Sequence, residues 1–334
     1  MRRRPAAAAF IILLAAAGPA VADTIAVTAQ PIALDPRDPG RHRVGALDFL
    51  AGFVLSGYSS QWGGWSGMTI APDGQSLTAI SDVGSWLVLD LRQDTAGRLT
   101  GIGAAAMWPV LDRQGRPLER KSWTDAEALA RDRDGSLLVA FERLHRLWRY
   151  PRDVAGRALP TPLDAPPAIL QLPANIGIEA MTVLDNGALL LISEDGLPGE
   201  RDIAAWLGRP GAWSRLTLAR SGSLTVSDAT LLPDGDVLLV ERDFSLLGAA
   251  LVRLSVVARA TIRPGARLVS RTLAELAPPL SVDNFEAAAA RTAPDGATLI
   301  YLLSDDNQSF LQRTLLFQLR VEPAAAAKAA AGLP

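Results

Sequence analysis

Carboxylate side chains recur in this sequence at fixed places around short turns. Asp125 and Glu127 stand at the start of an apolar run, and Glu142 ends the run that follows the next turn. Carboxylates brought together in this way can bind a divalent cation, transfer protons or pair with Arg. A cation site, a substrate pocket without a metal and simple Arg pairing are therefore three interpretations of these acids.

The same pattern occurs five times along the chain. Each copy has an apolar run, a turn that ends in Asp-Gly or Asn-Gly, and a second apolar run. The acids at the outer ends of these runs are the candidate metal ligands, with calcium as the ion that best suits several oxygen ligands. These acids are Asp82, Glu127, Glu179, Glu194, Asp228, Glu241, Glu286 and Asp305.

Proton transfer and substrate binding have their own candidates close to these acids. Glu127, Glu142 and His145 are the candidate catalytic residues, because carboxylates and imidazole exchange protons near neutral pH when their surroundings shift their pKa values. The candidate residues for binding a phosphate group are Arg143, Arg146 and Arg242.

Several kinds of chemistry are excluded by what the sequence lacks. It has no Cys and only two His residues, His42 and His145. A thiol nucleophile, a thiolate metal site and a multi-His zinc site are therefore impossible. No Walker or dinucleotide-binding glycine motif is present. Gly64-Trp65-Ser66-Gly67 lacks the spacing of a hydrolase nucleophile elbow, so Ser66 is interpreted as a small residue at a strand entrance.

The elements that position the acids are short strands joined by tight turns. The turn glycines stand at 74, 135, 187, 235 and 296, at intervals of 61, 52, 48 and 61 residues. Pro presets φ and Gly accepts a positive φ, so each turn predicts a hairpin. Five hairpins at this spacing, each followed by further apolar runs, predict an all-β fold: a single β-propeller with four-stranded blades.

Five blades follow from the repeat count, and six stay possible if the N-terminal region contains a degenerate unit. The strand expected at 45–57 would complete the last blade and close the ring. We therefore expect a leader segment at 23–44, the propeller domain at 45–322 and an Ala-rich tail at 323–334. Both acid positions of a hairpin fall at the same end, so the carboxylates should surround one mouth of the central channel.

The N-terminus carries the marks of an export signal. Three Arg residues precede an apolar run over 6–17 and an Ala-x-Ala site that ends at Ala22. The run is too short to span a membrane, which favours cleavage after Ala22 over an uncleaved anchor and predicts a periplasmic or secreted protein. Loss of the three Arg changes the net charge from −2 to −5, which disfavours nucleic acid as a partner. We expect a monomer that acts on a small molecule.

At its acidic motifs the sequence resembles the phytase-like family, also described as "esterase-like activity of phytase" proteins. The resemblance covers about residues 45–320 and rests on six motifs, which occur in the family's order: 65–68, 125–129, 175–181, 227–230, 284–287 and 304–307. It implies a propeller that hydrolyses phosphate esters or other esters. The alternatives are a non-catalytic periplasmic propeller that binds a ligand or partner, and a lactonase-like calcium-dependent hydrolase.

Overall fold

A computed structural model describes residues 23–154, 159–244 and 250–321. The expected signal peptide and the Ala-rich tail lie outside the described residues. Among the residues that are described, no helix has both the length and the apolar character that a membrane crossing requires.

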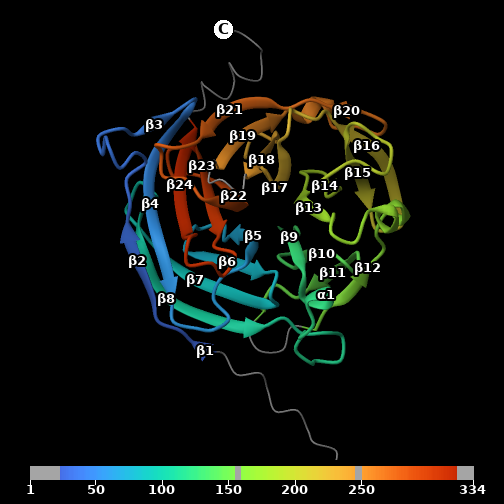
Figure 1. Cartoon of the computed structure of the whole chain (residues 1–334), viewed down its shortest axis with the longest axis horizontal. Coiled ribbons are helices and arrows are strands. Elements are labelled where there is room, and N and C mark those ends of the chain that lie inside the picture. Colours follow the sequence, from blue (N-terminus) through green and yellow to red (C-terminus); the bar gives the residue numbers. More distant parts are fainter. Residues whose placement is uncertain (1–22, 155–158, 245–249, 322–334) are drawn as a thin grey trace, which may run out of the picture.

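The described chain forms five antiparallel blades arranged around a central channel (Figure 1). The first three blades, from the channel outwards, are β5 (Trp65–Ile70), β6 (Ser76–Ser81), β7 (Ser85–Gln93) and β8 (Leu99–Pro109); β9 (Ala126–Arg131), β10 (Leu137–Phe141), β11 (Arg146–Tyr150) and β12 (Thr161–Leu163); and β13 (Ile178–Val183), β14 (Leu189–Ser193), β15 (Ile203–Arg209) and β16 (Ala212–Leu218).

The last two blades follow the same plan, with one strand from the N-terminal region. They are β17 (Thr225–Leu231), β18 (Val237–Phe244), β19 (Ala250–Val257) and β21 (Arg271–Leu276); and β22 (Asn284–Thr292), β23 (Thr298–Asp305), β24 (Thr314–Val321) and β4 (Leu47–Gly57). The expected propeller of four-stranded blades is confirmed, with five blades in the described residues.

Residues 23–44, which we expected to precede the propeller as a leader, carry three short strands that pair with it. They are β1 (Asp23–Thr24) on β8, and β2 (Val27–Pro31) and β3 (Arg43–Val44) on β4. A further short strand, β20 (Arg267–Leu268), pairs with β16. The helical elements are small: α1 (Lys121–Thr124), η1 (Pro167–Gln171) and η2 (Arg259–Thr261).

The hairpin turns between the two inner strands of each blade all lie at one end of the channel. Each has its Gly at positive φ, between 74° and 89°, which a residue with a side chain adopts only with strain. The start of the innermost strand and the end of the second strand therefore lie at the opposite end. We call this end the mouth; it faces the viewer in Figure 1.

A β-bulge recurs at the mouth end of every innermost strand. In blade 1, Trp65 pairs with Ser81 and Gly67 pairs with Ile80, so one residue is left out of the ladder. A bulge bends the strand and redirects the side chain of the extra residue. The bulged residues of blades 1 to 5 are Ser66, Glu127, Glu179, Ser227 and Glu286.

Asp228 ties two innermost strands together beneath the mouth. Its side chain is fully buried, and its two oxygens accept backbone N–H groups of Ala229 (2.7 Å) and of Ala288 on β22 (2.6 Å). A buried carboxylate that accepts two backbone amides fixes the spacing of blades 4 and 5 and satisfies donors that would otherwise lack a partner.

We expect Asp228→Ala to destabilise the fold, because it leaves two buried N–H groups without an acceptor. The free energy of unfolding should fall by about 2–5 kcal/mol, measured by denaturant titration. Asp90→Ala, at an exposed position of β7, is the matched control and should cost less than about 0.5 kcal/mol. Equal losses in the two variants would contradict the bridging role.

Candidate functional site

Two layers of side chains surround the mouth. The inner layer consists of the bulged residues, three of which are Glu. The outer layer consists of one residue from each second strand, which follows the partner of the residue just before the bulge. The outer residues of blades 1 to 5 are Asp82, Glu142, Glu194, Arg242 and Asp305.

The three inner Glu side chains converge from different blades. Burial raises the pKa of Glu127 well above its usual value, and the nearby charges of Glu179 and Glu286 raise it further. Burial and the charges of Glu194 and Glu286 raise the pKa of Glu179 in the same way, and the pKa of Glu286 is also raised. These side chains therefore resist ionisation unless a positive charge joins them.

Burial and neighbouring carboxylates also raise the pKa values of the outer acids. Burial, followed by the charges of Asp125 and Glu194, raises the pKa of Glu142 to about 7. Burial and the charge of Glu286 raise the pKa of Asp305 to about 8. Glu194 is half-buried, and its pKa is also raised, mainly by burial.

Two cations from the α1 region and the following blade hold Asp125. Its side chain is 1% exposed, and it forms ion pairs with Lys121 and with Arg143, whose Nε lies 2.5 Å from Oδ2. Lys121 also pairs with Asp82 of blade 1. The ammonium group of Lys121 thus bridges two carboxylates of neighbouring blades.

Blade 4 departs from the pattern at both layers. It supplies Ser227 where three other blades supply Glu, and Arg242 where all the others supply an acid. Nη1 of Arg242 lies 2.9 Å from Oε1 of Glu286 and donates to Oδ1 of Asn284 (2.6 Å). Arg242 is therefore the counter-ion that the propeller itself contributes to the inner carboxylates.

The acids that sequence spacing assigned to blade 4 lie outside these two layers. Asp228 is one residue beyond the bulge and holds the backbone of β22, as described above. Glu241 is one residue before the outer position; its Oε2 accepts the hydroxyl of Ser255 on β19 (2.5 Å). The other six candidate ligands, together with Asp125 and Glu142, belong to the mouth.

His145 and Arg146 are engaged in local contacts. Nε2 of His145 lies 3.2 Å from the carbonyl oxygen of Pro173. The guanidinium of Arg146 stacks on Phe141 (3.8 Å to the ring centroid) and Trp148 (4.5 Å), and burial lowers its pKa to about 10. This cation–π contact favours a packing role for Arg146, whereas Arg143 and Arg242 lie at the mouth.

A divalent cation fits the acids of blade 2. One ligand oxygen each from Asp125, Glu127 and Glu142 can be chosen so that all lie within 4.8 Å of one another. Ca²⁺ binds oxygen ligands at about 2.3–2.6 Å, so oxygens at this separation can share one ion. The nearby Oδ1 of Asp82 is buried and has no hydrogen-bond partner among the described residues. The donor set suits a cation, which would compete with Lys121 and Arg143 for Asp125.

Sequence spacing missed Lys121 and Ser227. Lys121 lies outside the repeats, in a four-residue helix, and its only sequence signal is that Lys is rare in this chain, the other being Lys328. Ser227 was hidden because the adjacent Asp228 completes the acidic pattern in the sequence, and only the strand register separates the two.

We expect the cation-free protein to lose stability as the pH rises. The raised pKa values of Glu142 (about 7) and Asp305 (about 8) mean that the folded chain retains protons that the unfolded chain releases near pH 4. The free energy of unfolding therefore falls between about pH 4 and pH 8. Thermal unfolding in chelator should show a falling Tm across this range, with a shallower fall for Glu142→Gln and Asp305→Asn. A Tm that rises over the range would contradict the buried, repelling acids.

Comparison with solved structures finds chains of low similarity. A protein provisionally named a gluconolactonase is 12% identical, with a TM-score of 0.42, covering 88% of this chain and 100% of the other. The Cps50 (Swd1) β-propeller domain of Myceliophteria thermophila is 9% identical, with a TM-score of 0.39 and coverages of 87% and 99%. The tail fibre of Staphylococcus aureus phage P68 is 12% identical, with a TM-score of 0.40 and coverages of 87% and 56%. At TM-scores below 0.5 these similarities do not bear on the chemistry of the mouth.

A search of curated proteins found no match. The family comparison is specific: the family described as "Phytase-like: Esterase-like activity of phytase" matches residues 60–308, which contain both layers of the mouth and all five bulges. Because the match covers well over half of the chain, this protein belongs to the phytase-like family.

Proposed function

We propose that this protein is an exported, cation-dependent hydrolase of phosphate esters or other esters. The observation that supports this most directly is the convergence of carboxylates from four blades on one mouth, with few cations to balance them. Ionising such a cluster without a ligand is unfavourable, because the like charges repel one another. Groups with strongly shifted pKa values often occur at functional sites. The family description, esterase-like activity of phytase, agrees with hydrolysis.

Asp125, Glu127 and Glu142 are the residues that we expect to hold the cation. A bound Ca²⁺ would supply positive charge for an ester oxygen and lower the pKa of a coordinated water. For a phosphate ester this charge is essential, because the cations of the chain at the mouth are already paired. Lys121 and Arg143 pair with Asp125, and Arg242 pairs with Glu286.

Glu194 is our candidate for proton transfer. It is coupled to Glu142 and Glu179, yet its side chain is half-buried and not fully enclosed. Its raised pKa brings proton exchange closer to neutral pH than in an ordinary Glu, as general acid–base catalysis requires. Arg242 would position the acyl or phosphoryl oxygens by hydrogen bonds that its fork geometry allows.

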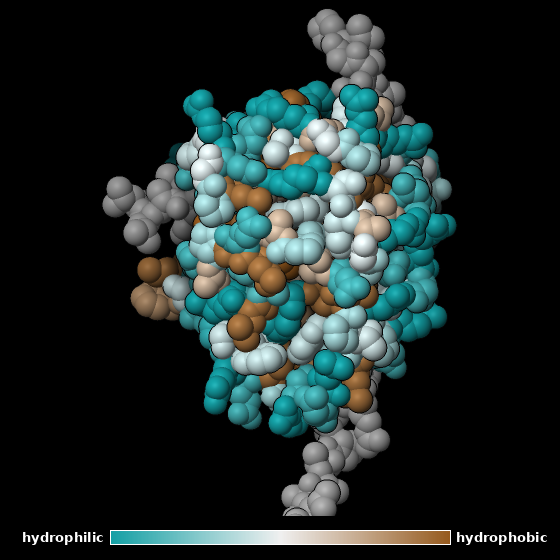
Figure 2. Space-filling view, turned by 90° about the vertical axis from the view of Figure 1, so that its right-hand side faces the viewer, coloured by the Kyte–Doolittle hydropathy of each residue, from teal (hydrophilic) through white to brown (hydrophobic). Residues whose placement is uncertain are grey.

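A second candidate substrate class, esters of apolar carboxylic acids, is favoured by the surface around the mouth. Six of the eight exposed large hydrophobic side chains of the described residues lie in loops or short helices at this end. Figure 2 shows hydrophobic atoms projecting from its left edge, the face that is turned to the viewer in Figure 1. These residues are Tyr58, Trp123, Leu144, Leu170, Phe310 and Leu311.

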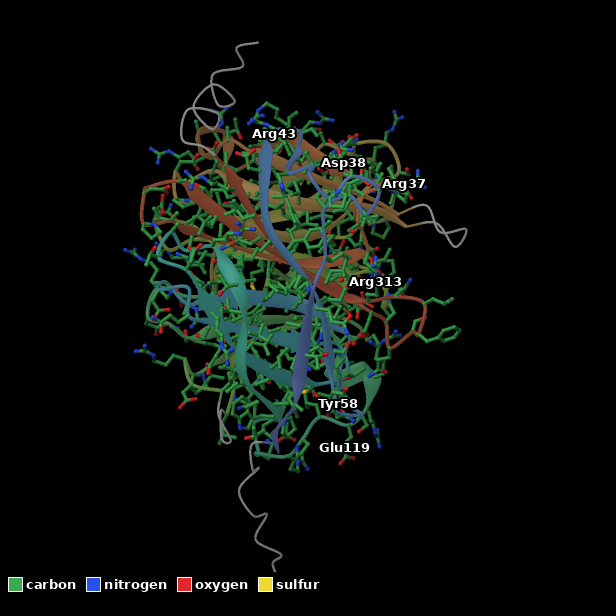
Figure 3. The ribbon with its side chains drawn as sticks, turned by 90° about the vertical axis from the view of Figure 1, so that its left-hand side faces the viewer. Arg37, Asp38, Arg43, Tyr58, Glu119 and Arg313 are labelled. Carbon is green, nitrogen blue, oxygen red and sulfur yellow. The ribbon has the colours of Figure 1, made fainter. Side chains whose placement is uncertain are left out.

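Phe310 and Leu311 form the most exposed part of this rim. They are 95% and 78% exposed, in the loop between β23 and β24. Figure 3 shows this loop extending beyond Arg313, with Tyr58 labelled in the same half of the view. An apolar acyl or aryl group bound here would leave its ester bond near the carboxylates, without the repulsion that a phosphate meets.

We expect ester hydrolysis that depends on calcium and on the carboxylates of blade 2. The purified protein should hydrolyse p-nitrophenyl phosphate, phytate or a p-nitrophenyl carboxylate with Ca²⁺ and lose this activity in chelator. Glu127→Gln should weaken calcium binding by at least about tenfold, measured by calorimetry, because it removes a charged ligand. Glu275→Gln, at an exposed position, is the matched control and should bind calcium normally.

The outcomes separate the alternatives. Calcium binding without turnover of any ester would overturn the hydrolase and leave a ligand-binding propeller. Turnover of lactones in preference to linear esters would identify a lactonase-like hydrolase. Turnover that is unaffected by chelator and by Glu127→Gln would refute the cation site.

Glu194→Gln tests proton transfer separately from cation binding. It should lower kcat by about a hundredfold and remove one ionisation from the pH–rate profile. Calcium affinity should fall much less than in Glu127→Gln, since Glu194 lies outside the group that fits the ion and acts on it only through its charge near Glu142. An unchanged pH–rate profile would exclude Glu194 from this role.

The apolar rim makes a prediction of its own about acyl chain length. Replacing Phe310 and Leu311 by Ser should raise KM for p-nitrophenyl hexanoate by about threefold or more and leave p-nitrophenyl acetate nearly unchanged, because only the longer chain buries apolar area. Leu159→Ser is the control, since Leu159 is exposed but lies away from the mouth. Equal effects on both esters would show that the rim does not contact the acyl group.

A further inference from the structure

A cavity occupies the channel at the end opposite the mouth. It has a volume of about 220 Å³ and is lined by three consecutive residues from the later part of each of the five innermost strands. The hairpin turns surround this end, and the labels β5, β9, β13, β17 and β22 mark its wall in Figure 1. None of the mouth carboxylates lines this cavity.

Arg131, at the end of β9, is the one charged residue in the cavity wall. Its Nη2 donates to Oγ1 of Thr69 on β5 (2.8 Å), and its Nη1 donates to the carbonyl oxygen of Gly135 (3.3 Å). Its Nε is buried and has no hydrogen-bond partner among the described residues. One donor of the guanidinium is therefore unsatisfied at the wall of a cavity.

No carboxylate balances this guanidinium. Among the described residues Arg131 forms no ion pair: the carboxylate of the adjacent Asp132 pairs with Arg149, and the charge that shifts the pKa of Arg131 is that of Arg152, which is also positive. Burial and this second cation lower the pKa of Arg131. Arg242, near the other end of the channel, is paired with Glu286, whereas Arg131 has no ion pair among the described residues and is suited to an anion.

Hydroxyl groups complete the wall. Thr182 on β13 and Thr230 on β17 line the cavity, and neither side chain has a hydrogen-bond partner among the described residues. A guanidinium and hydroxyls from different strands form a set of donors that suits a tetrahedral oxyanion, since Arg binds two oxygens and each hydroxyl donates to another.

We propose that the end of the channel opposite the mouth is a binding site for a small oxyanion such as phosphate or sulfate, held by Arg131 with Thr182 and Thr230. The site is separate from the proposed catalytic mouth and does not depend on hydrolysis. Binding there places negative charge where the channel has an uncompensated cation, and it should weaken as ionic strength rises.

Phosphate titration of the purified chain in chelator tests this proposal, because removal of divalent cations suppresses binding at the mouth. Calorimetry should show one phosphate per chain, with sulfate competing. Arg131→Gln should weaken binding by at least about tenfold, because a charged hydrogen-bonding partner is lost. Arg131→Lys, which keeps the charge, should recover part of the affinity. Arg313→Gln, an exposed Arg at the mouth, should bind normally.

A second set of variants distinguishes loss of phosphate binding from loss of folding. Thr182→Val and Thr230→Val keep the shape of the side chains and remove only the hydroxyls, and each should weaken phosphate by a few-fold with an unchanged Tm. The absence of phosphate and sulfate binding in the unmodified protein would overturn the proposal. Equal binding by the unmodified protein and a folded Arg131→Gln variant would overturn it as well.

Discussion

Repulsion between carboxylates at one end of the channel is the constraint on which the site depends. Two unit charges within 4.8 Å cost roughly 3 kcal/mol at the effective dielectric constant of a partly buried site. Asp125, Glu127 and Glu142 of blade 2 lie this close to one another, and carboxylates of three further blades join them at the mouth. The protein reduces this cost with Lys121, Arg143 and Arg242, and with acids that retain their protons near neutral pH. A bound cation would remove the remaining repulsion, so the clustered carboxylates can serve as its ligands.

The β-bulges explain how a regular sheet can direct Glu side chains to the channel mouth. In an unbroken strand, neighbouring side chains alternate between the two faces, and each must pack against the adjoining blade. The extra residue at a bulge interrupts this alternation, so its side chain does not pack between blades. Glu127, Glu179 and Glu286 are the extra residues at equivalent points of three blades. The repeated bulge therefore explains why Glu side chains recur at the mouth.

Blade 4 shows that the ring is not uniform, and the difference has an electrostatic role. A Glu at position 227 would be the fourth inner Glu, and an acid at position 242 would be the fifth outer acid, so together they would add two more negative charges to the mouth. Ser227 avoids one of them, and Arg242 replaces the other by a positive charge that pairs with Glu286 of the next blade. The opposite end of the channel has the reverse imbalance, because Arg131 there has no carboxylate partner. The two ends of one channel thus suit ligands of opposite charge.

The sequence was enough to predict the repeat, the hairpins and the end of the channel at which the acids gather, because turn chemistry and apolar runs act over a few neighbouring residues. It also identified six of the eight proposed metal ligands as residues of the mouth. Only the tertiary structure distinguished Ser227 from Asp228 and Arg242 from Glu241, since a one-residue change of register moves a side chain to the other face of the sheet. Lys121, the Arg131 cavity and the packing of Arg146 were likewise decided by contacts between blades, which spacing along the chain does not encode.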